Sequence, residues 1–189
     1  MSLPPKTERS IHVRFSKRDK AEYNKLEATA RAFYADFRGS NSNPGKHYLK
    51  LTQKLIPMRV ACAGGKIPLG TLEEIETGEN TLHEEDKVGK SLVKKKVRYS
   101  TFAIESKIDC LITELKAARE NDPSSKSLVF SMFQSSLEYL QEQLPKVGFQ
   151  FRTLRGDMSM SARAKALQEF QQDPPTTIFL LVRPRLRAT

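Results

Sequence analysis

The sequence of 189 residues contains no tryptophan and only two cysteines, Cys62 and Cys110. Two cysteines cannot build a disulfide framework, and a cysteine-rich zinc module needs closely spaced pairs that this sequence lacks. No apolar run approaches the roughly 20 residues that a membrane-spanning helix requires, and the polar N-terminus has no apolar core of a signal peptide. We therefore expect an intracellular protein with two reduced thiols, no cysteine-rich metal centre and no membrane partner.

Negative charge is scarce relative to positive charge. The 32 Lys and Arg residues outnumber the 22 Asp and Glu residues and give a formal net charge of +10. Such an excess favours contact with polyanions, of which nucleic acid is the first candidate. The alternative, that the protein is basic for an unrelated reason, stays open because many soluble proteins are basic.

The N-terminal part shows two kinds of hydrophobic periodicity. Residues 8–15 alternate apolar and polar side chains, which predicts a half-buried strand. Residues 17–37 carry apolar side chains three and four positions apart, which predicts a long helix. Ser16 would be the N-cap of this helix, and Asp19 would complete a shortened capping box. The apolar face of the predicted strand consists of Ile11, Val13 and Phe15.

A change in composition follows the first helix. Residues 39–45 predict a loop, and residues 46–62 predict a second helix that Pro57 should kink. From 64 to 98 the apolar periodicity disappears, and an acidic stretch is followed by a basic run that includes 94–96. Segregated charge has little to bury, so we expect a flexible linker or insertion. The basic run is also compatible with a nuclear-import signal or a DNA-contacting patch.

Helical and strand patterns alternate beyond residue 100. A helix that begins near Ser100 precedes three strands, at 126–130, 149–154 and 176–182, with one helix between each strand and the next. The first of these strands is a short continuous apolar run, of the kind buried on both faces of a sheet. The alternation predicts an α/β fold with a parallel sheet, in which ligands bind beyond the carboxyl ends of the strands.

No complete nucleotide-binding or catalytic motif accompanies this pattern. Gly89, Lys90 and Ser91 match the end of a phosphate-binding P-loop, but the motif requires a glycine where Glu84 stands. The three histidines are far apart in the sequence and offer neither a metal-binding pair nor an evident general base. We therefore assign no catalytic residue and expect no metal site.

Residues 126–181 carry the most informative pattern. The run "SLVFSMF" resembles the fourth helicase motif of Swi/Snf-related proteins, "GFQFRTLRGDMSMSARAKALQEF" resembles the strand–turn–helix unit that follows it, and "TTIFLL" resembles the strand before the fifth motif. Upstream, "STFAIESKIDCLITELKAAREND" resembles the helix that opens the same lobe, and "PPKTERSIHVRFSKRDKAEYNKLE" resembles the segment that joins the two lobes. The similarity is greatest to the DNA-repair branch that includes helicase-like transcription factor and SHPRH.

The resemblance implies a fold, a division of the chain and a set of partners. The fold would be α/β, a partial RecA-like sheet of the P-loop NTPase type with flanking helices, preceded by a helical extension. Residues 1–63 would be an inter-lobe segment, 64–98 a charged linker, 99–182 a partial helicase C-terminal lobe and 183–189 an aberrant tail. The parent protein would be an ATP- and Mg-dependent translocase on double-stranded DNA, acting in the nucleus in DNA repair or chromatin remodelling. A first RecA-like lobe or a nucleosome would be further partners.

The candidate site follows the first of the three strands. Ser131 would end that strand, and Gln134, Ser135 and Ser136 would begin the next helix, where hydroxyls and free backbone N–H groups are good phosphate ligands. Arg163 would lie near the start of the following helix. The resemblance implies that this edge of the sheet follows the DNA backbone, so that binding would be independent of sequence and sensitive to salt. The alternative is that these polar residues only cap helices, and the two roles are compatible.

Three features depart from the family pattern. Met132 stands where the family usually has glutamine, Arg155 stands where it usually has an acidic residue, and "VRPRLRAT" replaces a Gly-rich loop and a later arginine motif. We therefore expect a truncated chain that does not hydrolyse ATP by itself. The alternatives are a non-catalytic nucleic-acid-binding module, a protein-interaction fragment without ATPase activity, and an artefact of a gene model.

Overall fold

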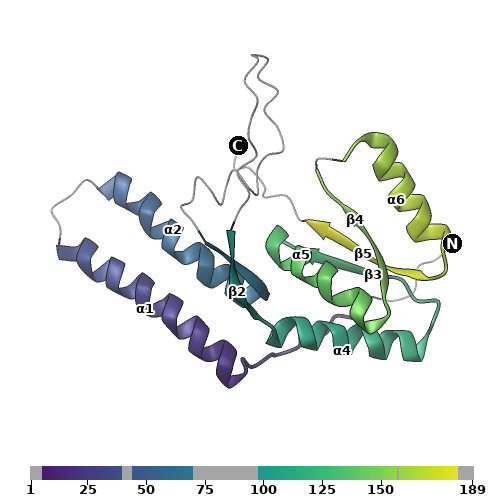
Figure 1. Cartoon of the computed structure of the whole chain (residues 1–189), viewed down its shortest axis with the longest axis horizontal. Helices are drawn as coiled ribbons and strands as arrows, with labels where there is room; N and C mark the ends of the chain where they lie inside the picture. The colour runs from purple at the N-terminus through teal and green to yellow at the C-terminus, as the bar shows by residue number, and fades with distance from the viewer. Residues whose placement is uncertain (1–5, 40–43, 70–97, 157, 183–189) are drawn as a thin grey trace, which may run out of the picture.

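A computed structural model of the chain describes residues 6–39, 44–69, 98–156 and 158–182. Figure 1 shows a helical hairpin and a small β-hairpin on one side of the molecule and an α/β unit on the other. The elements are, in chain order, α1 (Lys17–Gly39), α2 (Pro44–Ala63), β1 (Gly65–Leu69), β2 (Arg98–Ile104), α4 (Ser106–Asn121), β3 (Ser127–Ser131), α5 (Gln134–Gln143), the 3-10 helix η1 (Leu144–Val147), β4 (Gln150–Leu154), α6 (Met160–Gln172) and β5 (Thr176–Val182).

The α/β unit is built on three parallel strands in the order β3-β5-β4. Helices α4 and α5 cover one face of this sheet, where their apolar stripes meet the inward side chains of the strands in one continuous core. Burial of such stripes is the main force that holds helices against a sheet. The core includes Ile108, Leu115, Leu137, Leu140, Ile178 and Leu180. The predicted α/β fold with a parallel sheet is thereby confirmed.

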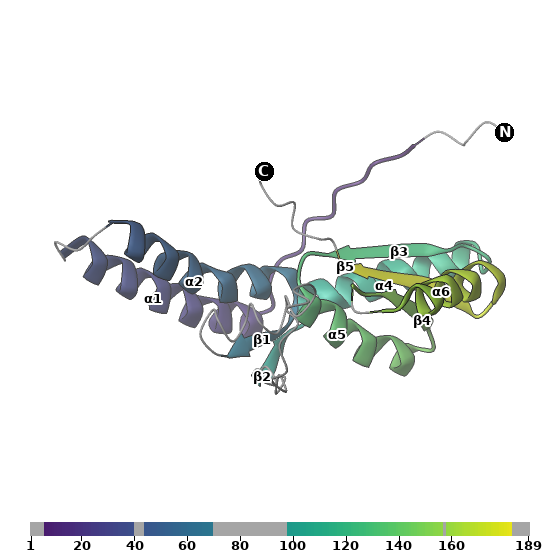
Figure 2. The ribbon, with the colours of Figure 1, turned by 90° about the horizontal axis from the view of Figure 1, so that it is seen from above.

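The opposite face of the sheet is covered only in part. Phe170 of α6 stacks on Phe179 of β5, with ring centroids 5.0 Å apart. On β3, by contrast, Leu128 is 55% exposed and Phe130 is 62% exposed. The prediction of a strand buried on both faces is wrong for β3. This strand lies at an edge of the described sheet, and α6 packs over the other two strands, β4 and β5, and leaves this face of β3 uncovered (Figure 2).

The N-terminal part begins with an extended segment rather than a strand. Residues 8–15 pair with no strand in the described part of the chain, and Ile11 and Val13 are 44% and 39% exposed. The segment is instead held by side chains, because Arg9 forms an ion pair with Glu114 of α4. The predicted half-buried strand is therefore wrong, since alternation alone does not supply the partner that a strand requires.

The two predicted helices of this part are confirmed as α1 and α2, which pack side by side as an antiparallel hairpin (Figure 1). We call residues 17–63 the helical extension. A buried cluster of Ala61, Ile67 and Ile104 joins its second helix to the β1–β2 hairpin, and Phe15, Tyr23 and Leu26 pack against this cluster. The β-hairpin is therefore one of the places where the extension is attached to the rest of the molecule.

The β1–β2 hairpin corrects two further predictions. Residues 98–104, where a helix was expected to begin near Ser100, form strand β2, and the helix begins at Ser106. The predicted linker over 64–98 contains strand β1, which pairs antiparallel with β2 so that Leu69 lies opposite Arg98. The residues that flank 70–97 therefore lie next to each other, and this favours an insertion over a linker. Residues 70–97 themselves, including Gly89, Lys90 and Ser91, lie outside the described residues.

No helix among the described residues combines the length and the apolar character needed to cross a membrane.

Candidate nucleic-acid interface

The carboxyl ends of the three parallel strands lie along one edge of the sheet. Ser131 at the end of β3 is in register with Val182 of β5, and Leu154 of β4 is in register with Leu181. In open parallel sheets, ligands bind beyond this edge, because the loops that follow the strands converge there. The turn before α5 and the turn before α6 are therefore the two segments in which binding residues are expected.

The turn between β3 and α5 presents two of the predicted residues. Ser131 is half-buried, and its Oγ accepts a hydrogen bond from the backbone N–H of Phe133 at 3.1 Å. Gln134 is also half-buried, and its Nε2 donates to Glu138 Oε1 at 2.8 Å. Phe133, the N-cap of α5, provides no side-chain hydrogen bond to the helix. The first backbone N–H groups of α5 thus point toward this turn with no side-chain cap, as phosphate-binding helix starts do.

Ser135 and Ser136 lie deeper than Ser131 and Gln134. Each is only 3% exposed, and within the described residues neither hydroxyl has a hydrogen-bond partner. They pack against the start of β1, where a Cβ on Gly65 would lie 3.2 Å from the Cα of Ser136. In this arrangement their hydroxyls are closed to solvent, and their contact with phosphate stays a prediction.

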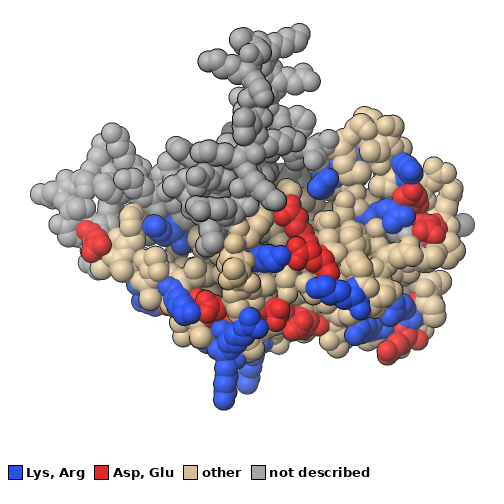
Figure 3. Space-filling model, in the orientation of Figure 1, with Lys and Arg blue, Asp and Glu red and all other residues tan. Residues whose placement is uncertain are grey.

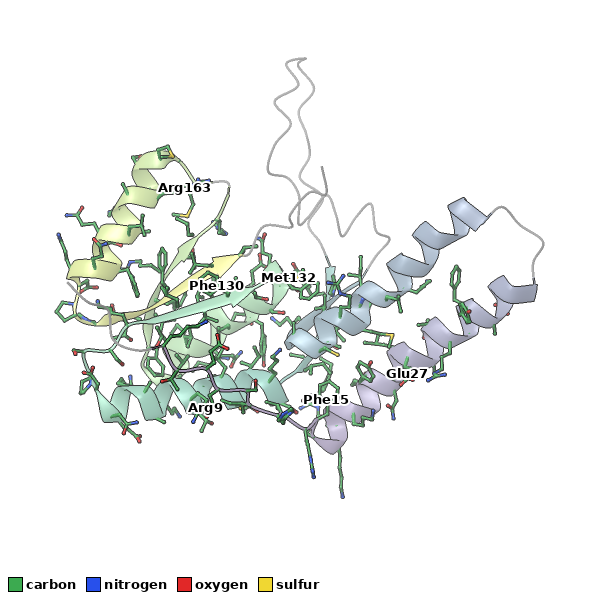
Figure 4. All side chains as sticks on the ribbon, turned by 180° about the vertical axis from the view of Figure 1, so that it is seen from behind. Arg9, Phe15, Glu27, Phe130, Met132 and Arg163 are labelled. Carbon is green, nitrogen blue, oxygen red and sulfur yellow. The ribbon has the colours of Figure 1, made fainter. Side chains whose placement is uncertain are left out.

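Arg163 lies at the second turn, on α6. Its Nη2 donates to the carbonyl oxygen of Gly156 at 2.6 Å, which ties the helix to the loop after β4. Its Nε is buried without a partner in the part of the chain that the structure describes. Ser159 caps α6 by accepting a hydrogen bond from the backbone N–H of Ala162 at 3.2 Å. Figure 4 shows Arg163 and Met132 at different turns, which follow strands β4 and β3, and β5 lies between these two strands.

A groove of about 480 Å³ runs beside β3 and ends at the β3–α5 turn. Most of the residues that line it are apolar, and Lys107, Ser131 and Ser136 are the polar ones among them. Met132 also lines the groove and is 43% exposed. In the orientation of Figure 3, Lys and Arg alternate with Asp and Glu over the described surface, without a single basic patch.

Sequence patterns did not reveal one buried carboxylate, that of Asp19. This residue is 2% exposed, and its Oδ2 accepts hydrogen bonds from the backbone N–H groups of Glu105 at 3.1 Å and Ser106 at 2.8 Å, and from the hydroxyl of Ser106. Ser16 caps α1 as predicted, since its Oγ accepts from the backbone N–H of Asp19 at 3.0 Å. Asp19, however, caps α4 rather than its own helix. We call this contact the Asp19 latch.

Two titratable groups near the Asp19 latch are shifted. Burial raises the pKa of Tyr139, and so does its hydrogen bond to Glu105 Oε1 at 2.8 Å, so the phenol remains protonated near neutral pH. Burial also raises the pKa of Asp109, and the negative charges of Glu105 and Asp19 add to the effect. Both shifts disfavour the ionised form of side chains near the start of α4.

The described residues contain no group of three or more His, Cys, Asp and Glu side chains placed to hold a metal ion. The two cysteines, one exposed and one partly buried, form no disulfide with each other.

Comparisons with known proteins match the α/β unit. Residues 106–183 match the family model of the helicase conserved C-terminal domain. The chain is 34% identical over 97 residues to the ATP-dependent helicase rhp16 of Schizosaccharomyces pombe, which is 51% of this chain and 11% of that protein. It is 38% identical over 84 residues to the DNA repair protein RAD5 of Gibberella zeae, and 39% identical over 66 residues to the helicase-like transcription factor of Mus musculus. These two matches cover 44% and 35% of this chain, and each covers 7% of the relative.

A solved structure extends the likeness in fold over most of the chain. The C-terminal domain of the SWI2/SNF2 ATPase of Sulfolobus solfataricus superposes with a TM-score of 0.58 over 91% of this chain and 61% of that one, at 10% identity. The predicted resemblance is thereby confirmed for the α/β unit, and the parallel sheet is that of a RecA-like lobe. Residues 106–183 are therefore similar to the helicase conserved C-terminal domain, and the relatives that they resemble are a helicase, a DNA repair protein and a helicase-like transcription factor.

Proposed function

We propose that this chain supplies the second RecA-like lobe of an ATP-dependent, Swi/Snf-type DNA translocase that acts in DNA repair or chromatin remodelling in the nucleus. The lobe contacts backbone phosphates of double-stranded DNA through the carboxyl edge of its sheet. Support comes from the family match, from relatives named as a helicase and as DNA repair proteins, and from the geometry of the edge. The observation that carries the proposal is the β3–α5 turn, where Ser131 and Gln134 stand at a helix start without a side-chain cap.

The chemistry of this turn suits a phosphate group. A hydroxyl, a side-chain amide and free backbone N–H groups all donate hydrogen bonds to phosphate oxygens, and the partial positive charge of a helix start attracts the anion. None of these donors reads a base, so the binding is independent of DNA sequence. Because each phosphate contact releases a counterion, the affinity falls as salt rises.

ATP and Mg²⁺ enter the proposal through the family alone, as the cofactors that the resemblance implies. The described residues do not form a metal site, and we assign none of them to hold either group. In this proposal a first RecA-like lobe holds the nucleotide, and the present lobe moves along DNA as the two lobes close.

The proposal is tested by binding of the chain to fluorescently labelled DNA duplexes of unrelated sequence, followed by anisotropy. We expect equal affinity for duplexes of different sequence and a loss of affinity when Ser131 and Gln134 are both replaced by alanine. Gln168→Ala is the matched control, because the side chain of Gln168 lies on α6 and bonds only to Gln172 among the described residues. Strong preference for one sequence, or equal binding by the double variant and the control, would contradict phosphate contact at this turn.

Docking of a protein is the second candidate function, and one observation favours it. Leu128 and Phe130 expose an apolar face on the edge strand β3, and edge strands with such a face are common protein-binding sites. A chain that binds no duplex at any salt concentration would leave this function as the better candidate.

A further inference from the structure

We propose that the helical extension takes part in the nucleic-acid interface, and that Arg59 of α2 and Lys107 of α4 each bind a backbone phosphate of the DNA beside the β3–α5 turn. This inference rests on the proposed function and adds two residues to it. Neither was singled out by the sequence patterns, and Arg59 lies outside the residues matched by the helicase family model.

The position of Arg59 is fixed by contact between α2 and the turn itself. Phe133, which separates Ser131 from Gln134 in the turn, is only 7% exposed and packs into a cluster with Ile56 and Val60 of α2. The guanidinium carbon of Arg59 lies 5.6 Å from the centre of the Phe133 ring, within the range of a cation–π contact. The extension therefore places a cation directly beside the residues proposed to bind phosphate.

Arg59 and Lys107 differ from other basic residues of the molecule. Within the described residues neither forms an ion pair, and both are exposed. Lys66, by contrast, pairs with Glu142 at 2.8 Å, and Arg152 pairs with Glu169. An exposed cation without a carboxylate partner keeps its charge available for an anion from solution, and a guanidinium matches the geometry of phosphate oxygens.

The groove beside β3 links Lys107 to the polar turn, whereas Arg59 reaches the turn through its contact with Phe133. Lys107, Ser131, Phe133 and Ser136 all line the groove, but the Ser136 hydroxyl itself is buried and closed to solvent. Glu138, the acidic residue bonded to Gln134, accepts a second hydrogen bond from Tyr99, so both of its carboxylate oxygens have partners. Positive charge and backbone N–H groups without a side-chain cap thus meet at the start of α5, which is the arrangement that an anion requires.

The path of the DNA follows from this arrangement. Figure 4 shows Met132, at the end of the sheet edge, between the α/β unit and the lower end of the helical extension. A backbone that contacts Ser131 and Gln134 would next meet Arg59 on α2. The extension then widens the interface, and the Asp19 latch, which binds α1 to α4, keeps it in place.

The experiment measures duplex affinity at several salt concentrations for the full chain and for Arg59→Gln, Lys107→Gln and Arg59→Lys. The plot of log affinity against log salt has a negative slope, and each lost phosphate contact should reduce the steepness of this slope by about 0.9. We expect this reduction for each of the two glutamine variants. Both variants should also bind several-fold more weakly at low salt. Arg59→Lys keeps the charge and should keep the slope. Thermal unfolding of each variant shows whether the fold is preserved.

Lys116→Gln is the matched control, because Lys116 is exposed on the same helix as Lys107 but lies nine residues further along, on the opposite face. If the unaltered chain binds duplex in a salt-dependent way but Arg59→Gln and Lys107→Gln change the slope no more than Lys116→Gln, the inference is wrong while the proposed function stands. If the unaltered chain binds no duplex, the proposed function fails, and this inference fails with it.

Discussion

The α/β unit is stabilised by one kind of interaction, and the helical extension is attached to it by another. The α/β unit has one continuous apolar core between α4, α5 and the parallel strands. The extension is attached by small apolar clusters and by the hydrogen bonds of one buried carboxylate, that of Asp19. The comparison shows that a continuous core fixes a fold by bulk burial, whereas a joined extension depends on a few directional contacts.

Removal of a central core side chain should have the largest effect. Leu140 is 1% exposed within the core of the α/β unit, so Leu140→Ala should lower the free energy of unfolding by about 2–5 kcal/mol. Chemical denaturation followed by circular dichroism measures this loss. Leu167→Ala is the matched control. Leu167 is 43% exposed on α6, so this substitution should lower the free energy of unfolding much less. Equal losses in the two variants would contradict a core centred on α5.

Loss of the Asp19 carboxylate should loosen the extension and leave the α/β unit folded. Asp19→Ala leaves the backbone N–H groups of Glu105 and Ser106 without their acceptor, a cost of about 1–3 kcal/mol. Hydrogen–deuterium exchange should become faster in α1 and in the first turn of α4, but not in β3 or β5. Asp36→Ala, an exposed position on the same helix, should change none of these rates. Faster exchange throughout the parallel sheet would show that the two regions are not separable.

Gly65, where β1 packs on α5, should be harder to replace than Gly148 of the α/β unit. Gly65 has a φ of 97°, and a Cβ there would lie 3.1 Å from the Cβ of Tyr139 and 3.2 Å from the Cα of Ser136. Gly148 has a φ of 74°, with no atom within 4 Å of such a Cβ. Both alanine variants carry the backbone penalty of about 1–2 kcal/mol, and Gly65→Ala carries steric repulsion as well. The melting temperature should therefore fall further for Gly65→Ala than for Gly148→Ala, and the reverse order would contradict close packing of β1 on α5.

The smallest effect concerns the titration of Asp109. Its pKa is raised by burial and then by the charges of Glu105 and Asp19, so its contribution favours the folded state below the unfolded value of about 3.9 and is lost as the pH rises through the folded value. Removal of one negative neighbour in Asp19→Ala should lower the pKa of Asp109 part of the way, because its burial remains. NMR titration of the side-chain carboxyl measures this shift, and an unchanged midpoint would contradict the charge coupling.

The sequence predicted the α/β unit better than the extension. Strands β3, β4 and β5 and the helices between them have regular apolar periodicity, because each buries one stripe or face in a shared core. Apolar periodicity does not show which other segments pair with an element or pack on it. For this reason residues 8–15 were expected to form a strand, and β3 was expected to be buried on both faces. The β1–β2 hairpin was missed because its strands are separated by 28 residues and pair only in the folded chain.

The candidate site was predicted in part for the same reason. Ser131 and Gln134 follow a recognisable strand, so their place at the carboxyl edge could be expected from the alternation of elements. Burial of Ser135 and Ser136 depends on the packing of β1 against α5, and the position of Arg59 depends on the contact between α2 and Phe133. Contacts between residues so far apart in the chain leave no local pattern.

The most direct test of the account is hydrogen–deuterium exchange of the full chain with and without a DNA duplex at low salt. The account predicts protection of the β3–α5 turn around residues 131–136 and of the C-terminal half of α2, and loss of that protection when salt is raised. Protection confined to other surfaces, or protection that salt does not weaken, would contradict a phosphate-binding edge at the carboxyl end of the sheet.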